Sequence, residues 1–161
     1  MTSRLAARAL PLCLAATLLG VSAGTVPAGG QQSPVQVVPG MSNIWEVWCA
    51  PDGVCLGVGA VDVGAGRLVG AVVVLRAAGP IGPVRLVPGT SSLHDIDCSP
   101  AGSCIAIGVG TFSTAGPAVV EVSRDGAPGP PVVVPGMTDV SHVACPTATT
   151  CLVTGIRRTF T

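Results

Sequence analysis

The sequence predicts an all-β fold that is built from repeats of about 48 residues, with four antiparallel strands in each repeat. The first observation is a motif that occurs three times, at residues 38–59, 87–108 and 134–155. Each copy reads Val-Pro-Gly, three variable residues, an aliphatic residue, two variable residues, an aliphatic residue, one variable residue, Cys, five residues, Cys, an aliphatic residue, two residues and Gly. The second observation is that no segment beyond the N-terminus has a helical period, whereas short apolar runs alternate with Gly- and Pro-rich turns.

Four strands can be placed on each of the first two copies. The first strand ends at the first cysteine, the second begins at the second cysteine, and two more follow after Gly-rich loops. Gly79-Pro80 and Asp125-Gly126 mark the turns before the fourth strands. The predicted strands are 44–49, 55–61, 69–76 and 84–87, then 93–98, 104–109, 118–123 and 132–134, with a fourth-type strand at 34–38 before them and the first strand of a third copy at 140–145.

The two cysteines of each motif are separated by five residues, which suits a hairpin loop. Facing residues of a hairpin lie about 4.5 to 5.5 Å apart, within the Cα separation of about 4.4 to 6.8 Å that disulfides favour. Zinc ligands are usually about two to four residues apart, so disulfides fit this spacing better than metal binding. We therefore expect three bridges that each stabilise the fold by about 2 kcal/mol, namely Cys49 with Cys55, Cys98 with Cys104 and Cys145 with Cys151.

Four strands in each repeat are typical of a propeller blade, so we predict an incomplete β-propeller. The third copy reaches Thr161 soon after its second strand, whereas propellers close with about 4 to 8 blades. Three explanations remain open: a fragment of a longer gene product, a ring that several chains complete, and a three-fold β-trefoil-like structure.

The chain also resembles, over residues 34–155, the Cys-Pro-x4-Cys-x3-Gly repeats of secreted actinobacterial propeller-like proteins. The segment from Cys145-Pro146 to Gly155 carries this resemblance most closely, whereas Ala50 and Ser99 stand where the first two copies would need proline. The resemblance implies a propeller-like fold and an extracellular location, and it implies no activity.

The N-terminus has the features of an export signal. Arg4 and Arg8 precede an apolar core at 9–19 that is too short to span a bilayer, and a small-residue cleavage site ends at Ala23, with a second candidate that ends at Ala28. We expect a signal peptide at 1–23, a linker at 24–33 and a β-repeat domain at 34–161, with repeats near 38–86, 87–133 and 134–161, the last one incomplete.

Composition excludes some partners. Six arginines and eight acidic residues follow the predicted signal, and there is no lysine, so no basic patch is available for a phosphate backbone and we expect no nucleic-acid partner. No apolar run after the signal approaches the roughly 20 residues of a membrane-spanning helix, so we expect no transmembrane segment and a secreted protein. The open edge of an unfinished sheet favours self-association.

The strand before each first cysteine is the most informative place to look for a site. Strand alternation puts Val47, Ile96 and Val143 on the face of their cysteines and the polar positions on the opposite face. In a propeller, equivalent positions of successive blades converge, so varied polar and aromatic residues there predict a binding surface for an unknown protein or glycan. The alternative is the solvated face of a half-buried strand. The candidate binding residues are Trp45, Glu46, Trp48, Asp95 and His142.

Catalytic chemistry has less support. His94 and Asp95 are adjacent on a strand and point apart, no Gly-x-Ser-x-Gly elbow exists, and every cysteine after the signal has a matched partner. Asp95 and Asp97 share a face, which is a weak indication of a metal or a carboxylate pair. We expect no cofactor and no metal, and a noncatalytic secreted scaffold or binding module rather than an enzyme. The alternative is a fragment of a larger extracellular propeller hydrolase.

Overall fold

The computed structural model describes residues 37–77, 79–111 and 116–157, and these residues form antiparallel sheets without a helix. The all-β prediction is therefore confirmed. The predicted signal, the linker and the tail after Arg157 lie outside the described residues. Most of the strand expected at 34–38 also lies outside them, and Val37 and Val38 are not in a strand.

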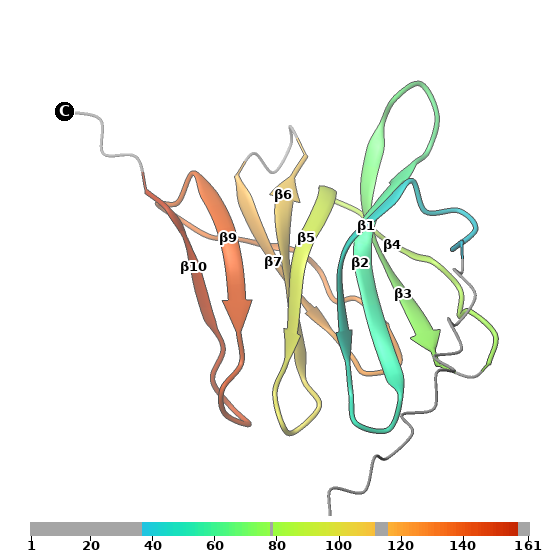
Figure 1. Cartoon of the computed structure of the whole chain (residues 1–161). Helices are drawn as coiled ribbons and strands as arrows, with labels where there is room; N and C mark the ends of the chain where they lie inside the picture. The colour runs from blue at the N-terminus through green and yellow to red at the C-terminus, as the bar shows by residue number, and fades with distance from the viewer. Residues whose placement is uncertain (1–36, 78, 112–115, 158–161) are drawn as a thin grey trace, which may run out of the picture. The chain divides into compact units, whose positions relative to one another are not determined.

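Ten strands make three sheets that follow one another along the chain (Figure 1). Two sheets have four strands in sequential order, and the third is a two-stranded hairpin. The first sheet holds β1 (Asn43–Cys49), β2 (Val54–Asp62), β3 (Leu68–Arg76) and β4 (Arg85–Val87), the second holds β5 (Thr90–Cys98), β6 (Cys104–Gly110), β7 (Pro117–Val122) and β8 (Val132–Val133), and the third holds β9 (Asp139–Ala144) and β10 (Leu152–Ile156). Over the described residues the sheets do not close into a ring or a barrel.

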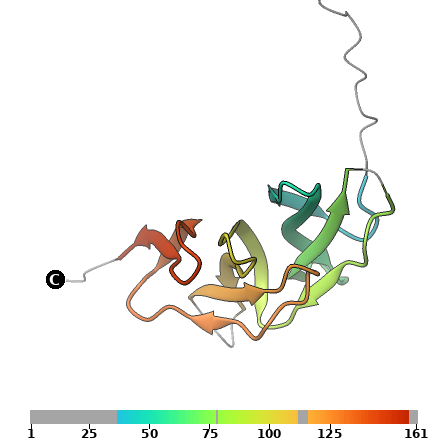
Figure 2. The ribbon, with the colours of Figure 1, turned by 90° about the horizontal axis from the view of Figure 1, so that it is seen from below.

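The apolar core lies between successive sheets, which face one another in the view from below (Figure 2). Alternation sends every second residue of a strand toward one neighbouring sheet, so a Val-rich strand supplies two apolar faces. The second sheet uses both of its faces in this way. One face joins the first sheet through a cluster that includes Leu56, Val72, Ile96 and Val120, and the other meets the third sheet around Ile107.

The paired cysteines form the three predicted disulfides at the mouths of the hairpins. Cys49 faces Cys55 and Cys98 faces Cys104 in the strand register. The Cα atoms of the three pairs are 4.0, 3.9 and 4.0 Å apart, closer than the separation we expected. Three disulfides indicate that the protein folds in an oxidising compartment.

The tip of the third hairpin differs from the other two. In the first two, the residue after the cysteine donates a backbone hydrogen bond across the tip, from Ala50 N to Val54 O at 2.9 Å and from Ser99 N to Ser103 O at 2.8 Å. The corresponding residue of the third hairpin is Pro146, which has no N–H. That tip is therefore closed by its disulfide without this backbone bond.

The last glycine of each motif lies where two strands approach closely. A Cβ atom on Gly59 would collide with the carbonyl oxygen of Asn43, and Gly108 and Gly155 are confined in the same way by Ser92 and Asp139. The motif therefore ends in glycine because no side chain fits there. The glycines of the three Val-Pro-Gly segments have φ of 85°, 91° and 76°, the positive φ that a type II turn requires after its proline.

Candidate functional site

The first strands of the three sheets, β1, β5 and β9, lie side by side with β5 in the middle (Figure 1). We call this arrangement the first-strand row. The motif places equivalent residues of the repeat at equivalent heights along the row, so side chains from neighbouring copies can contact each other. All five candidate binding residues belong to these strands.

Each first strand contains a β-bulge at the same position of the repeat. The register shifts between Ile44 and Glu46 in β1 and between Leu93 and Asp95 in β5, so that Trp45 and His94 are the extra residues, and Ser141 is the extra residue in β9. A bulge changes the direction of the side chain that it carries. The predicted alternation therefore applies to the residues between the bulge and the cysteine, and it does not extend to the residues before the bulge.

The bulges of β1 and β5 bring two rings together. The Trp45 and His94 ring centroids are 5.1 Å apart and the rings are nearly perpendicular, at 89°. The His94 Nε2 atom lies 2.7 Å from the Ser92 hydroxyl oxygen, which holds the imidazole in place. Trp45 is 44% exposed, so one part of its indole packs between sheets and another part faces solvent.

Asp95 and Asp97 connect the second and third sheets. One oxygen of Asp95 accepts a hydrogen bond from Val143 N at 2.9 Å, and one oxygen of Asp97 accepts a hydrogen bond from Cys145 N at 2.7 Å. The other oxygen of each carboxylate accepts a bond from the next amide of β5, at 2.8 and 2.9 Å. Both carboxylates are thus engaged with backbone amides and hold β9 against β5. His142 Nδ1 lies 3.7 Å from the same Asp95 carboxylate, although the His142 side chain is 82% exposed.

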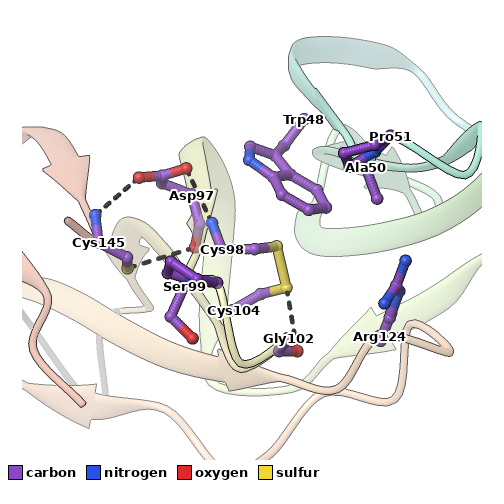
Figure 3. A pocket seen from close by; sticks show the side chains of 11 residues that line it. Trp48, Ala50, Pro51, Asp97, Cys98, Ser99, Gly102, Cys104, Arg124 and Cys145 are labelled. Atoms are coloured by element: carbon purple, nitrogen blue, oxygen red, sulfur yellow. Dashed lines mark hydrogen bonds between the residues drawn. A yellow bond between two sulfur atoms is a disulfide. The ribbon is translucent and has the colours of Figure 1, made fainter. Parts of the chain in front are cut away.

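A groove of about 500 Å³ lies between the first two disulfide hairpins (Figure 3). Ala50 and Pro51 of the first tip and Ser99 and Pro100 of the second tip form its walls. The half-buried indole of Trp48 lies between the first tip and the Cys98–Cys104 disulfide, which forms part of the lining. An aromatic face, two prolines and a disulfide make this surface mostly apolar and rigid.

Arg124 brings a positive charge to the same groove from the turn after β7. Its Nη2 atom lies 2.5 Å from Asp52 Oδ2 at the tip of the first hairpin, so an ion pair joins the first sheet to the second across the rim. The Val54 N–H and the Arg124 guanidinium lower the pKa of Asp52 below its usual value. The guanidinium remains half exposed and retains donors for a further partner.

Ser99 is the one buried side chain of the groove wall whose hydroxyl has no hydrogen-bond partner among the described residues. Ser99 as a whole is only 4% exposed. A buried hydroxyl without a partner is uncommon in folded proteins. Ser99 is therefore a polar residue in a part of the wall whose neighbours Ala50, Pro51 and Pro100 are apolar.

The structure brings two of the five candidate binding residues together, since His142 Nδ1 lies 3.7 Å from the Asp95 carboxylate, and it distributes the others along β1. Trp48 lines the groove, Trp45 and Glu46 are exposed on β1, Asp95 links two sheets, and His142 is exposed on β9. The Val47 side chain is 40% exposed, whereas the equivalent Ile96 and Val143 are buried with their cysteines as expected.

The residues that sequence reasoning missed are at the hairpin tips and in the turn after β7. Pro51, Pro100 and Arg124 come from three segments that are distant in sequence, and Asp52 and Arg124 are 72 residues apart. Pro51-Asp52-Gly53 and Pro100-Ala101-Gly102 have the composition of turns. The groove between these tips could have been inferred because the hairpins of successive repeats lie next to each other.

Among the described residues, no three His, Cys, Asp or Glu side chains are grouped as a metal site would require. No helix in the described part of the chain is long and apolar enough to span a membrane. Comparisons with protein-family models, with curated proteins and with solved structures find no match to this chain.

Proposed function

We propose that this protein is a noncatalytic extracellular binding module whose sheets are the blades of a propeller-like fold, and that the groove between the first two hairpins contacts its ligand. The order of four antiparallel strands, the face-to-face packing and the adjacent first strands support the blade assignment. The proposed ligand is a segment of a protein or a glycan at the cell exterior.

The observation that carries the proposal is the position of Trp48. Its indole is half-buried in a groove that two rigid hairpin tips enclose, with the Arg124 guanidinium at the rim. Tryptophan and arginine are the side chains that contribute most often to binding energy, and a rigid wall reduces the entropy lost on binding. The carboxylates of the first-strand row serve structure instead, because Asp95 and Asp97 are bonded to backbone amides.

The test is a binding screen of the purified, oxidised protein against an array of soluble glycans and a library of short peptides. Every hit is then measured with Trp48→Phe and Arg124→Gln, and with Trp45→Phe as the matched control outside the groove. We expect the groove variants to weaken binding by about tenfold or more while the control binds normally. Hits that bind all variants equally, or a screen without hits, would contradict the proposal.

A further inference from the structure

The groove between the first two hairpin tips offers no excess of positive charge. The described residues that line it include one guanidinium, that of Arg124, and one carboxylate, that of Asp97. Asp52 forms an ion pair with Arg124 at the rim, so a second carboxylate stands beside the same cation. The charge of Asp97 is itself stabilised by two backbone amides. Charge complementarity therefore favours a neutral ligand over an anionic or a cationic one.

The walls of the groove give a peptide no strand edge to pair with. The backbone N–H and C=O groups of Ala50 and Ser99 are all hydrogen-bonded within their own hairpin tips. Pro51 and Pro100 have no N–H to donate. A peptide that binds by strand addition needs main-chain hydrogen bonds with a sheet edge. Recognition in this groove therefore depends on its side chains.

The side chains of the groove combine a flat apolar surface with an acceptor and a donor. Figure 3 shows the Trp48 indole between Asp97 and Arg124. Each Asp97 oxygen accepts one bond from a backbone amide, and a carboxylate oxygen can accept a second. Arg124 retains N–H donors besides the one on Nη2 that Asp52 accepts. A ligand group that both donates and accepts hydrogen bonds suits both ends of this arrangement.

A sugar ring has the complementary combination of groups. The C–H groups on one face of the ring are apolar and can pack against an indole, whose N–H is a further donor. The hydroxyls around the ring donate and accept hydrogen bonds without carrying a charge. One hydroxyl can thus donate to Asp97 and another can accept from Arg124 while the ring covers Trp48. Sites for small ligands are commonly built in this way, from an aromatic surface and a few polar groups.

A second groove, of about 450 Å³, adjoins the first at the tip of the second hairpin. The two grooves share Gly102, Cys104 and Arg124 in their lining. Glu121 of β7 lines the second groove and adds a further carboxylate there. A chain of several sugars can therefore contact both grooves at once, and its binding then depends on Glu121 as well as on Trp48.

We propose, on the basis of the groove as the binding site, that the ligand is a neutral oligosaccharide. One sugar stacks on Trp48 with its hydroxyls bonded to Asp97 and Arg124, and the chain continues past Arg124 to Glu121. This inference rests on the function proposed above and names the chemical class of the ligand.

The first test is calorimetry of the oxidised full chain with neutral oligosaccharides of glucose, xylose, mannose and N-acetylglucosamine. Oligomers of galacturonic acid are the matched acidic ligands, and proline-rich and basic peptides complete the set. We expect a neutral oligomer to bind most tightly, with an affinity that changes by less than about twofold between about 0.01 M and about 1 M ionic strength, because no net charge is paired. Trp48→Phe should weaken this binding by about tenfold, whereas Trp45→Phe, the control outside the groove, should not.

The second test compares each single sugar with its oligomer. The oligomer should bind about tenfold more tightly, because it contacts both grooves. Glu121→Gln should weaken binding of the oligomer by about threefold to tenfold and leave binding of the single sugar unchanged. Glu46→Gln is the matched control, since Glu46 is an exposed carboxylate that lines neither groove.

The outcomes separate this inference from the proposed function. If an acidic oligomer or a peptide binds most tightly and Trp48→Phe weakens it, the groove remains the binding site and its assignment to neutral sugars is overturned. If neutral oligomers bind Trp48→Phe and Trp45→Phe equally, both the groove and this inference are overturned. The inference is also overturned if no neutral oligomer binds, or if the oligomer binds no more tightly than the single sugar.

Discussion

Asp97 accepts a hydrogen bond from the backbone N–H of Cys145 at 2.7 Å, across the boundary between the second and third sheets. Its other carboxylate oxygen accepts a bond from Cys98 N at 2.9 Å. One side chain thereby satisfies an amide of its own strand and an amide of the next first strand. Asp95 repeats the arrangement two residues earlier, so the third sheet is attached to the second by a pair of carboxylates as well as by apolar packing.

The first prediction is that Asp97→Asn destabilises the protein. An amide side chain has one oxygen and one NH2 group, so one of the two backbone amides loses its acceptor and faces another donor. We expect the free energy of unfolding to fall by about 1 to 3 kcal/mol in urea denaturation. Glu46→Gln is the matched control, because Glu46 occupies in β1 the repeat position that Asp95 occupies in β5. The Glu46 side chain is exposed and accepts a hydrogen bond from the adjacent amide of Val47. A control that loses as much stability as Asp97→Asn would contradict this explanation.

The repeat and its hairpins could be predicted from the sequence because both are local. A motif with a fixed Cys-x5-Cys spacing determines which residues face each other at the mouth of a hairpin, and Val-Pro-Gly requires a turn with glycine at positive φ. The strand ranges predicted from residue 44 onward agree with the structure to within about three residues.

The functional surface could not be predicted because it depends on contacts between copies of the repeat. The bulges at Trp45 and at His94 have no local sequence signal other than the glycine on the neighbouring strand. These bulges bring the Trp45 and His94 rings into contact. The sequence predicts a binding role for Asp95 and only weakly indicates a carboxylate pair of Asp95 with Asp97, yet each of the two carboxylates accepts a hydrogen bond from an amide 48 residues away. The groove is formed by two hairpin tips together with Arg124, and no pattern in the sequence shows that these three segments lie next to each other.

The second prediction concerns the glycine that ends each motif. Gly108→Ala should lower the free energy of unfolding by about 1 to 3 kcal/mol, because a methyl group there collides with the Ser92 carbonyl oxygen and the bulge must move. Gly129→Ala is the control, since a Cβ at that position meets the Glu121 carbonyl oxygen only at 3.4 Å. Thermal unfolding of both variants should show a large loss for the first and a small change for the second. Equal losses would mean that the cost is not steric.

The third prediction separates the disulfides by position. Replacing Cys49 and Cys55 by alanine should lower the free energy of unfolding by about 2 kcal/mol without opening the first hairpin, because β2 is also paired with β3. Replacing Cys145 and Cys151 should open β9 and β10 locally, since Pro146 removes the tip bond and β10 has no second neighbour among the described residues. Hydrogen exchange should show a larger acceleration at Thr154 in the second variant than at Val58 in the first, because Val58 is exposed only when the whole sheet unfolds. An equal acceleration in the two hairpins would contradict the difference.

The fourth prediction is loss of stability in acid through Asp52. The Val54 N–H and then Arg124 lower the pKa of Asp52 below 3.8, so the unfolded chain binds a proton at a higher pH than the folded chain does. The contribution is therefore complete above pH 3.8 and disappears as the pH falls through the folded pKa. Asp52→Asn should reduce the dependence of the urea midpoint on pH in this acid range, and Arg124→Gln should reduce it less, because the Val54 N–H remains. An Asp52→Asn variant with the slope of the parent would contradict the assignment.

The last prediction concerns the Ser99 hydroxyl in the wall of the groove. Because this buried group has no partner among the described residues, Ser99→Ala should leave the free energy of unfolding unchanged or raise it by about 1 kcal/mol. Ser92→Ala is the matched control, since Ser92 is also buried and its hydroxyl lies 2.7 Å from His94 Nε2, so its removal should cost about 1 kcal/mol. Urea denaturation of the two variants gives the comparison. A loss of stability in Ser99→Ala as large as that in Ser92→Ala would contradict this prediction and show that water in the groove forms a hydrogen bond with the Ser99 hydroxyl. This part of the groove wall would then offer a polar contact to a ligand.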